Sequence, residues 1–129
     1  MSEAALLLAS VEAAIARAGD PTDAIYAALF ARHPELERLF ALDVDGGRRR
    51  HMLSETIDVL ADLLGRNAYG GNFIASERVN HENLGVSREA FPDFFVVTRD
   101  VIKGALGDDW TDAYDAAWAR ALASAADCL

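Results

Sequence analysis

The chain of 129 residues has one cysteine, three prolines and no long run of apolar residues. Because the lone Cys128 cannot form an internal disulfide bond, a reducing compartment, the cytoplasm, is expected. No apolar stretch approaches the roughly 18 residues that a membrane helix needs. The N-terminal segment carries the acidic Glu3 where a secretory signal needs basic residues, so no signal peptide is expected.

Basic residues are also scarce, with 12 Lys and Arg against 21 Asp and Glu, for a net charge of −9. This balance argues against nucleic-acid binding, which needs a basic face, and it disfavours an anionic membrane surface. The one basic cluster is Arg48-Arg49-Arg50-His51. The length suits one folded unit, so residues 1–129 are predicted to form a single domain.

Apolar residues recur at helical spacing along the whole chain, and the alternation typical of strands is absent. The fold class is therefore predicted to be all-α, with about seven or eight helices joined by short connections. The expected helices cover approximately residues 2–17, 20–33, 34–40, 48–64, 73–83, 87–105 and 111–127. Pro92 falls in the first two turns of the helix over 87–105 and is expected to bend it.

His81 lies in the run Arg78-Val-Asn-His-Glu-Asn-Leu-Gly-Val86, which an apolar, Phe-rich helix pattern follows. A neutral imidazole can hold a haem iron from one side and leave the other side free for a diatomic ligand. The plain alternative is a capped or solvated histidine at a helix end, because one histidine is a weak signal.

Three segments together carry a family resemblance: Leu29–Phe40, His81–Val86 and Leu106–Trp118. Each resembles the corresponding part of single-domain bacterial globins and of the globin part of flavohaemoglobins, and their order and separations also fit. The resemblance covers nearly the whole chain from about Asp20. It implies a globin fold around a haem b pocket.

Carried over residue by residue, the resemblance makes His81 the iron ligand and Tyr26 a hydrogen-bond donor to a bound ligand. It also implies wall residues of the haem pocket, namely Phe40 and Val86 at the haem edge and Phe91 and Phe94 on the proximal side. The alternative for Phe40 and Tyr26 is an ordinary place in the core.

The ligand side is less regular, because family members often place Gln or His four residues before an aliphatic residue over the ligand. Here the aliphatic residue is Met52 or Leu53, so the polar position falls on Arg48 or Arg49. An arginine there, Arg49 in particular, is a candidate partner for a haem propionate, since three arginines at a helix start oppose the helix dipole. The alternative is a solvated basic turn.

Two further positions depart from the family pattern. Glu77 stands where an aliphatic residue is expected against the haem, and a buried carboxylate is costly. Glu77 should therefore either swing out to solvent or pair with a cation such as Arg78 or Arg66. We expect it to swing out, which requires the segment 73–80 to be distorted or mobile. Phe91 replaces a tyrosine that relays hydrogen bonds to the proximal histidine of flavohaemoglobins, so strong oxygen activation is not expected.

Three functions remain open at this point. The first is a haem globin that reversibly binds oxygen, NO or CO at a pentacoordinate iron, for transport, storage or scavenging. The second is an enzyme, a stand-alone NO dioxygenase or peroxidase with an external reductase. The third is a globin-fold sensor or interaction module without haem, which Glu77 and the missing distal Gln favour. His81, Tyr26 and Phe40 favour the first two, and a haem-binding globin is the predicted function. A monomer and a homodimer are both compatible with the sequence.

Overall fold

The computed structural model describes residues 1–129 and consists of six α-helices and two 3-10 helices, without strands. In chain order these are α1 (Glu3–Ala18), α2 (Thr22–Arg32), η1 (Pro34–Phe40), α3 (Gly47–Leu64), α4 (Gly70–Asn83), α5 (Asp93–Leu106), η2 (Gly107–Asp109) and α6 (Asp112–Ala126). The all-α expectation is confirmed, with boundaries within a few residues of those expected for most helices. None of these helices combines the length and apolar character that crossing a bilayer requires.

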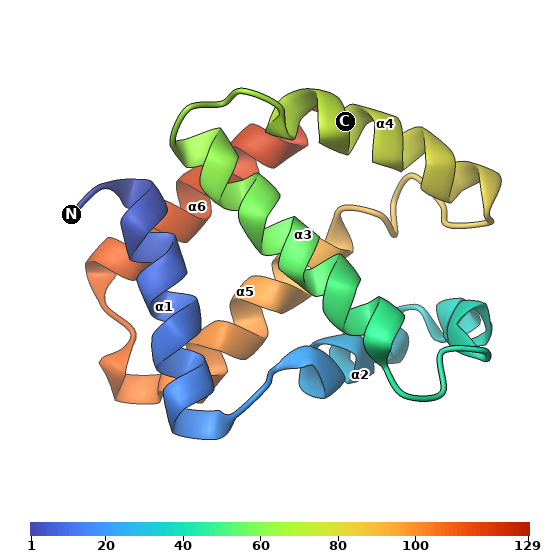
Figure 1. Cartoon of the computed structure of the whole chain (residues 1–129), viewed down its shortest axis with the longest axis horizontal. Coiled ribbons are helices and arrows are strands. Elements are labelled where there is room, and N and C mark those ends of the chain that lie inside the picture. The colour runs from blue at the N-terminus through green and yellow to red at the C-terminus, as the bar shows by residue number, and fades with distance from the viewer.

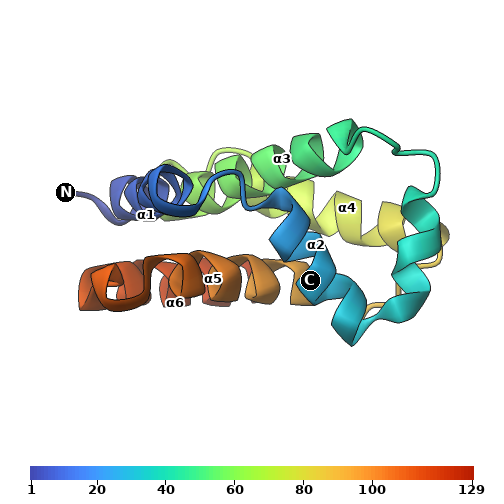
Figure 2. The same ribbon diagram turned by 90° about the horizontal axis from the view of Figure 1, so that it is seen from below.

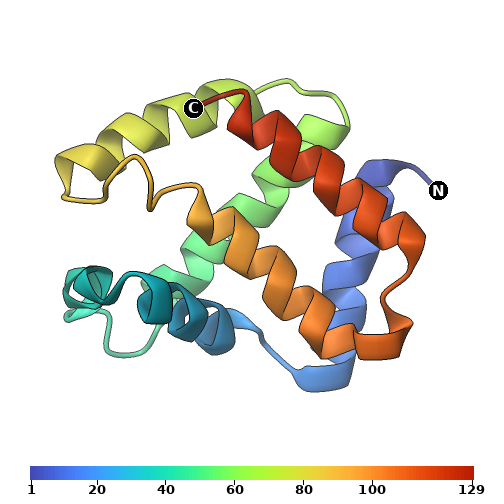
Figure 3. The same cartoon turned by 180° about the vertical axis from the view of Figure 1, so that it is seen from behind.

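The helices form two layers, with α1 and α3 in one and α5 and α6 in the other, while α2 and η1 close one end (Figure 2). α3 runs obliquely across the molecule, past α1 and α6 at one end and α2 at the other (Figure 1). From behind, α5 and α6 lie in front of the first layer, and α4 lies apart from α2 and η1 (Figure 3). This arrangement leaves α4 facing η1 and α2 across the end of α3.

The main core lies between the two layers around Trp118, whose side chain is fully buried. The indole Nε1 of Trp118 donates a 2.8 Å hydrogen bond to Oγ of Ser10, which in turn donates to the carbonyl of Leu7 at 2.6 Å. These bonds satisfy the polar atoms that burial takes out of water. The second core cluster surrounds Tyr26 and Leu53 beneath α2 and α5.

The start of α3 is held by Asp43, although three arginines follow it. The carboxylate of Asp43 accepts from the backbone N–H of Arg48 at 2.9 Å and of Arg49 at 3.0 Å, and from Nε of Arg49 at 3.0 Å. The hydrogen bond from the Arg48 N–H, with the bonds from Arg49 and its positive charge, lowers the pKa of Asp43 against the opposing effect of desolvation. Asp43 therefore supplies the negative charge that the helix dipole favours at the start of α3.

Asp43→Asn is expected to lower the melting temperature at pH 7, because it removes the charge that these donors stabilise. A depressed pKa means that the unfolded chain takes up the proton first. The stabilisation is therefore complete above about pH 5 and is lost as the pH falls below about 4. Melting curves should show that the difference in melting temperature between wild type and Asp43→Asn becomes smaller as the pH is lowered. Asp45→Asn is the control on the same turn, and a gap independent of pH would contradict this account.

The connection between α3 and α4 is anchored by Asp62, whose carboxylate accepts from the backbone N–H of Ala68, Tyr69 and Gly70 at 3.2, 3.1 and 2.7 Å. Desolvation by itself would raise the pKa of Asp62, but these donors lower it. A Cβ at Gly70 would lie 3.0 Å from the carbonyl oxygen of Val59, so the close approach of α4 to α3 favours glycine here. With its start fixed in this way, α4 is a continuous helix, and the expected distortion of 73–80 is wrong.

The expected bend at Pro92 is also wrong. α5 begins at Asp93, directly after Pro92, and residues 87–92 form turns in which Oγ of Ser87 accepts from the N–H of Ala90 at 3.1 Å. Proline suits the start of a helix because its missing N–H has no helical partner there. Pro92 therefore lies directly before α5 and does not interrupt it.

Candidate functional site

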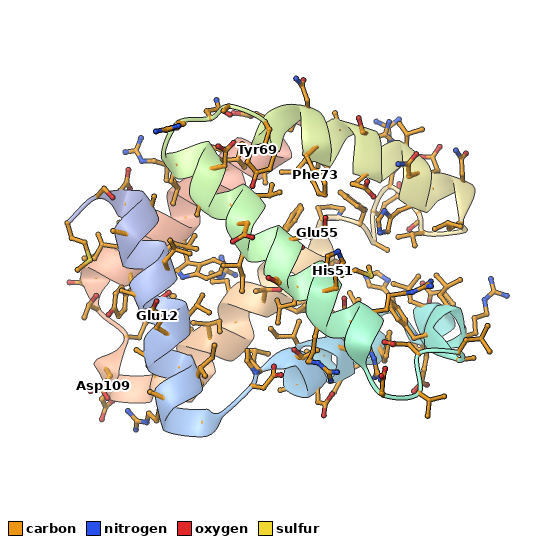
Figure 4. The ribbon with its side chains drawn as sticks, viewed as in Figure 1. Glu12, His51, Glu55, Tyr69, Phe73 and Asp109 are labelled. Atoms are coloured by element: carbon orange, nitrogen blue, oxygen red, sulfur yellow. The ribbon has the colours of Figure 1, made fainter.

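A cavity of about 380 Å³ opens between α3, α4 and the α2–η1 segment, within the size range of cofactor sites. Fifteen of its 20 lining residues are hydrophobic, which suits a flat apolar ligand. The lining residues are Tyr26, Leu29, Leu36, Leu39, Phe40, Arg48, Met52, Glu55, Thr56, Val59, Phe73, Ile74, Glu77, His81, Leu84, Val86, Ala90, Phe91, Phe94 and Phe95. Phe73 extends from α4 towards α3, on which His51 and Glu55 lie (Figure 4).

His81 lies in the wall that α4 forms, half-buried, with Nδ1 2.7 Å from the carbonyl oxygen of Glu77. Since a carbonyl only accepts, Nδ1 carries the proton of this bond, and Nε2 keeps its lone pair. The ring of Phe91 packs edge-on against His81 with centroids 5.2 Å apart. The Glu77 carbonyl and the Phe91 ring thus orient the imidazole, and Nε2 has no hydrogen-bond partner.

Tyr26 lies on α2 in a separate aromatic group, with ring centroids 5.2 Å from both Phe40 and Phe94. Its side chain is 2% exposed, and its hydroxyl has no hydrogen-bond partner. Burial raises the pKa of Tyr26 well above its ordinary value, so the hydroxyl stays a neutral donor at physiological pH. An unpaired buried hydroxyl is costly, and an acceptor inside the cavity would relieve that cost.

One face of α3 lines the cavity through Arg48, Met52, Glu55, Thr56 and Val59. Their spacing is that of a single helical stripe. The sequence left open whether Arg48 or Arg49, and Met52 or Leu53, faces the cavity. In the structure Arg48 and Met52 line it. Neither Arg49 nor Leu53 lines it.

Arg49 and Leu53 have other neighbours. Leu53 is buried in the core cluster beneath α2. The guanidinium of Arg49 is bound to Asp43, through Nε to the carboxylate and through Nη2 to the carbonyl oxygen, both at 3.0 Å. The anion next to Arg49 is therefore a residue of the chain itself.

Glu77 lies at the cavity edge, and its side chain is 34% exposed. Its carboxylate Oε2 is 3.5 Å from Nδ1 of His81, while Arg78 pairs with Glu82 at 3.0 Å. Glu77 pairs with neither Arg78 nor Arg66, and it is only partly exposed beside His81 instead of swung out fully to solvent. A regular helix places residues four apart on one face, so Glu77 and His81 are neighbours.

Seven of the nine site residues proposed from the sequence line this one cavity: Tyr26, Phe40, Met52, His81, Val86, Phe91 and Phe94. The analysis of the sequence missed several others. Glu55, Thr56 and Val59 continue the helical stripe from Met52, and Phe73 and Ile74 continue the one from His81, so periodicity would have found them. Leu36, Leu39, Leu84 and Ala90 lie outside the α-helices and carry no such signal.

A metal ion held by protein side chains alone has no support here, because no group of three or more His, Cys, Asp or Glu residues is arranged to hold one. His81 offers a single nitrogen. An iron that arrives with four porphyrin nitrogens needs only one protein ligand to be held. The donor set and the apolar lining therefore fit haem better than a bare ion.

Comparison with protein families matches residues 23–129 to the family model described as Globin. All the residues that line the cavity fall within this matched part. Comparisons with curated proteins and with solved structures gave no match. The match concerns the family as a whole, so the closer resemblance to single-domain bacterial globins and flavohaemoglobins stays a prediction.

Proposed function

Because this chain belongs to the globin family, we propose that it holds haem b in the cavity and binds a small diatomic ligand there reversibly. His81 is the proposed iron ligand. The observation that carries the proposal is a free Nε2 in the wall of an apolar cavity, on an imidazole whose other nitrogen is bound to the Glu77 carbonyl. Haem supplies the iron and the open coordination position at which oxygen, NO or CO binds.

The residues of the chain orient the His81 ring and pack against the porphyrin. The hydrogen bond from Nδ1 to Glu77 and the edge contact with Phe91 fix the ring orientation of His81. Phe40, Val86 and Phe94 supply flat or branched apolar surface against which a porphyrin packs. Burial of that surface contributes most of the binding free energy of such a group.

The ligand side favours reversible binding over oxygen activation. Tyr26 supplies one neutral donor that stays protonated. Phe91, which packs against His81, has no hydroxyl for a relay to a carboxylate. Action as an NO dioxygenase or peroxidase would in addition require electrons from an external reductase. We expect the protein in the cytoplasm, as a monomer or homodimer.

The alternative is a globin-fold sensor or interaction module without haem. The half-buried carboxylate of Glu77 at the cavity edge favours it, because a charge there opposes the binding of an apolar group. Glu77 is nevertheless 34% exposed, so water retains access to its carboxylate. This access reduces the free-energy cost of placing the Glu77 carboxylate beside an apolar ligand. Haem binding is therefore the better supported function.

Titration of the purified protein with haemin tests the two functions directly. One haemin should bind per chain, with a Soret band that sharpens to a clear end point and a spectrum of imidazole-ligated iron. On reduction, carbon monoxide should shift this band. If haemin adds no more absorbance than it does to a buffer blank, the haem-free alternative is favoured instead.

A further inference from the structure

Arg48 is the only cationic Lys or Arg side chain among the residues that line the cavity. It is the first member of the stripe on α3 that continues one turn later with Met52. Its backbone is fixed, because its N–H donates to Asp43 at 2.9 Å. Arg48 lines the cavity and is exposed, whereas Tyr26 lines it and is 2% exposed, so we infer that Arg48 lies at the mouth of the cavity and Tyr26 in its interior.

The neighbouring arginines are occupied, and Arg48 is not. Arg49 is bound to the carboxylate and carbonyl of Asp43, and Nη1 of Arg50 donates to the carbonyl of Asp45 at 2.9 Å. No carboxylate forms an ion pair with the Arg48 guanidinium: Asp43 pairs with Arg49, and Glu55 of the same stripe lies 3.2 Å from Nε2 of His51. Five N–H donors are therefore free at the mouth.

The rest of the molecule repels anions, since the net charge is −9. Two carboxylates, Glu55 and Glu77, also line the cavity, and Arg48 is the Lys or Arg charge in the lining that offsets them. A charge at the rim of a site acts mainly on the association rate and its salt dependence. An unpaired guanidinium in this lining should therefore speed the entry of an anion that the two carboxylates and the net charge slow.

We propose that Arg48 speeds the entry of small monovalent anions, such as azide, nitrite or fluoride, into the cavity, against the repulsion of Glu55 and Glu77. The inference rests on the proposed haem-binding function for the iron at which the anion arrives. It concerns ligands of ferric iron, and neutral ligands of ferrous iron gain nothing from Arg48.

The test is the association rate of azide with the ferric, haem-loaded protein by stopped-flow absorbance. Arg48→Gln should slow association about tenfold at low salt, and Arg48→Lys should retain most of the rate. Added salt should reduce the difference in azide association rate between wild type and Arg48→Gln. Association of carbon monoxide with the ferrous protein should change by less than about twofold, because the ligand is uncharged.

Arg50→Gln is the matched control, since it changes the net charge equally two residues away and outside the cavity lining. Equal slowing in both variants would reduce the effect to net charge and overturn the proposal. Unchanged azide binding with weaker haemin binding in Arg48→Gln would also overturn it, because Arg48 would then pair with a propionate.

A second measurement keeps the proposal testable if the protein takes up no haemin, in which case the proposed function itself fails. In the protein without haem, the anionic dye anilinonaphthalene sulfonate should bind severalfold more weakly to Arg48→Gln than to Arg50→Gln. The neutral dye Nile red should bind both variants equally. Equal affinity of both variants for the anionic dye would overturn the role of Arg48.

Discussion

Replacing His81 with glycine is expected to remove the bond between the protein and the haem iron, and added imidazole is expected to restore it. Loss of a partner that merely orients a metal-binding histidine costs about 10- to 100-fold in metal affinity, so loss of the ligand itself should cost more. The cavity left by the side chain is next to Phe91, and it has room for free imidazole. Haemin titration with and without imidazole measures both effects.

The matched control for this experiment is His51→Gln on the exposed side of α3. His51 lies outside the cavity lining, with Nε2 3.2 Å from Glu55, so the substitution should leave haemin binding unchanged. Circular dichroism should show the same helix content for all three proteins. If His81→Gly gives the wild-type spectrum without imidazole, the assignment of His81 as iron ligand fails.

The elements of this fold follow closely from local signals in the sequence. Ser2 caps α1 and Thr111 caps α6, each accepting a hydrogen bond from the N–H three residues on. Asp20 accepts from the N–H of Thr22 at 2.9 Å, where the sequence predicted the start of α2. Such capping signals act between residues close in sequence, so they can be recognised without knowledge of the tertiary structure.

Register on the ligand side could not be predicted, because it depends on packing. Adjacent helix positions point about 100° apart, so the rotation of α3 about its axis decides whether Met52 or Leu53 faces the cavity. The rotation is set by Asp43 at the start of α3 and by the burial of Leu53 against α2. Both interactions join segments whose relative placement the hydrophobic pattern leaves open.

The wrong expectations at Glu77 and Pro92 have a common physical origin. Each assumed that an unfavourable residue distorts the helix that contains it. α4 instead keeps its regular form with Glu77 half-exposed beside His81, and α5 begins after Pro92. A shift of one boundary or partial exposure of one side chain costs less than breaking several backbone hydrogen bonds.

Tyr26→Phe is expected to have opposite effects on ligand binding and on the stability of the protein without haem. The Tyr26 hydroxyl is buried and unpaired, so removing it should leave the haem-free protein equally stable or slightly more stable in thermal unfolding. Tyr114→Phe is the control, because Tyr114 packs against Trp110, outside the cavity.

In the haem-loaded protein the same substitution should speed oxygen dissociation by about threefold to a hundredfold, because the ligand loses its hydrogen-bond donor. A neutral hydrogen bond contributes roughly 0.5–1.5 kcal/mol, a bond to a ligand that carries negative charge contributes more, and each 1.4 kcal/mol corresponds to about tenfold. Flash photolysis and ligand-replacement kinetics measure the rate. An unchanged rate in Tyr26→Phe would leave Tyr26 as a core residue without a part in ligand binding, and its unpaired hydroxyl would then need a water as partner.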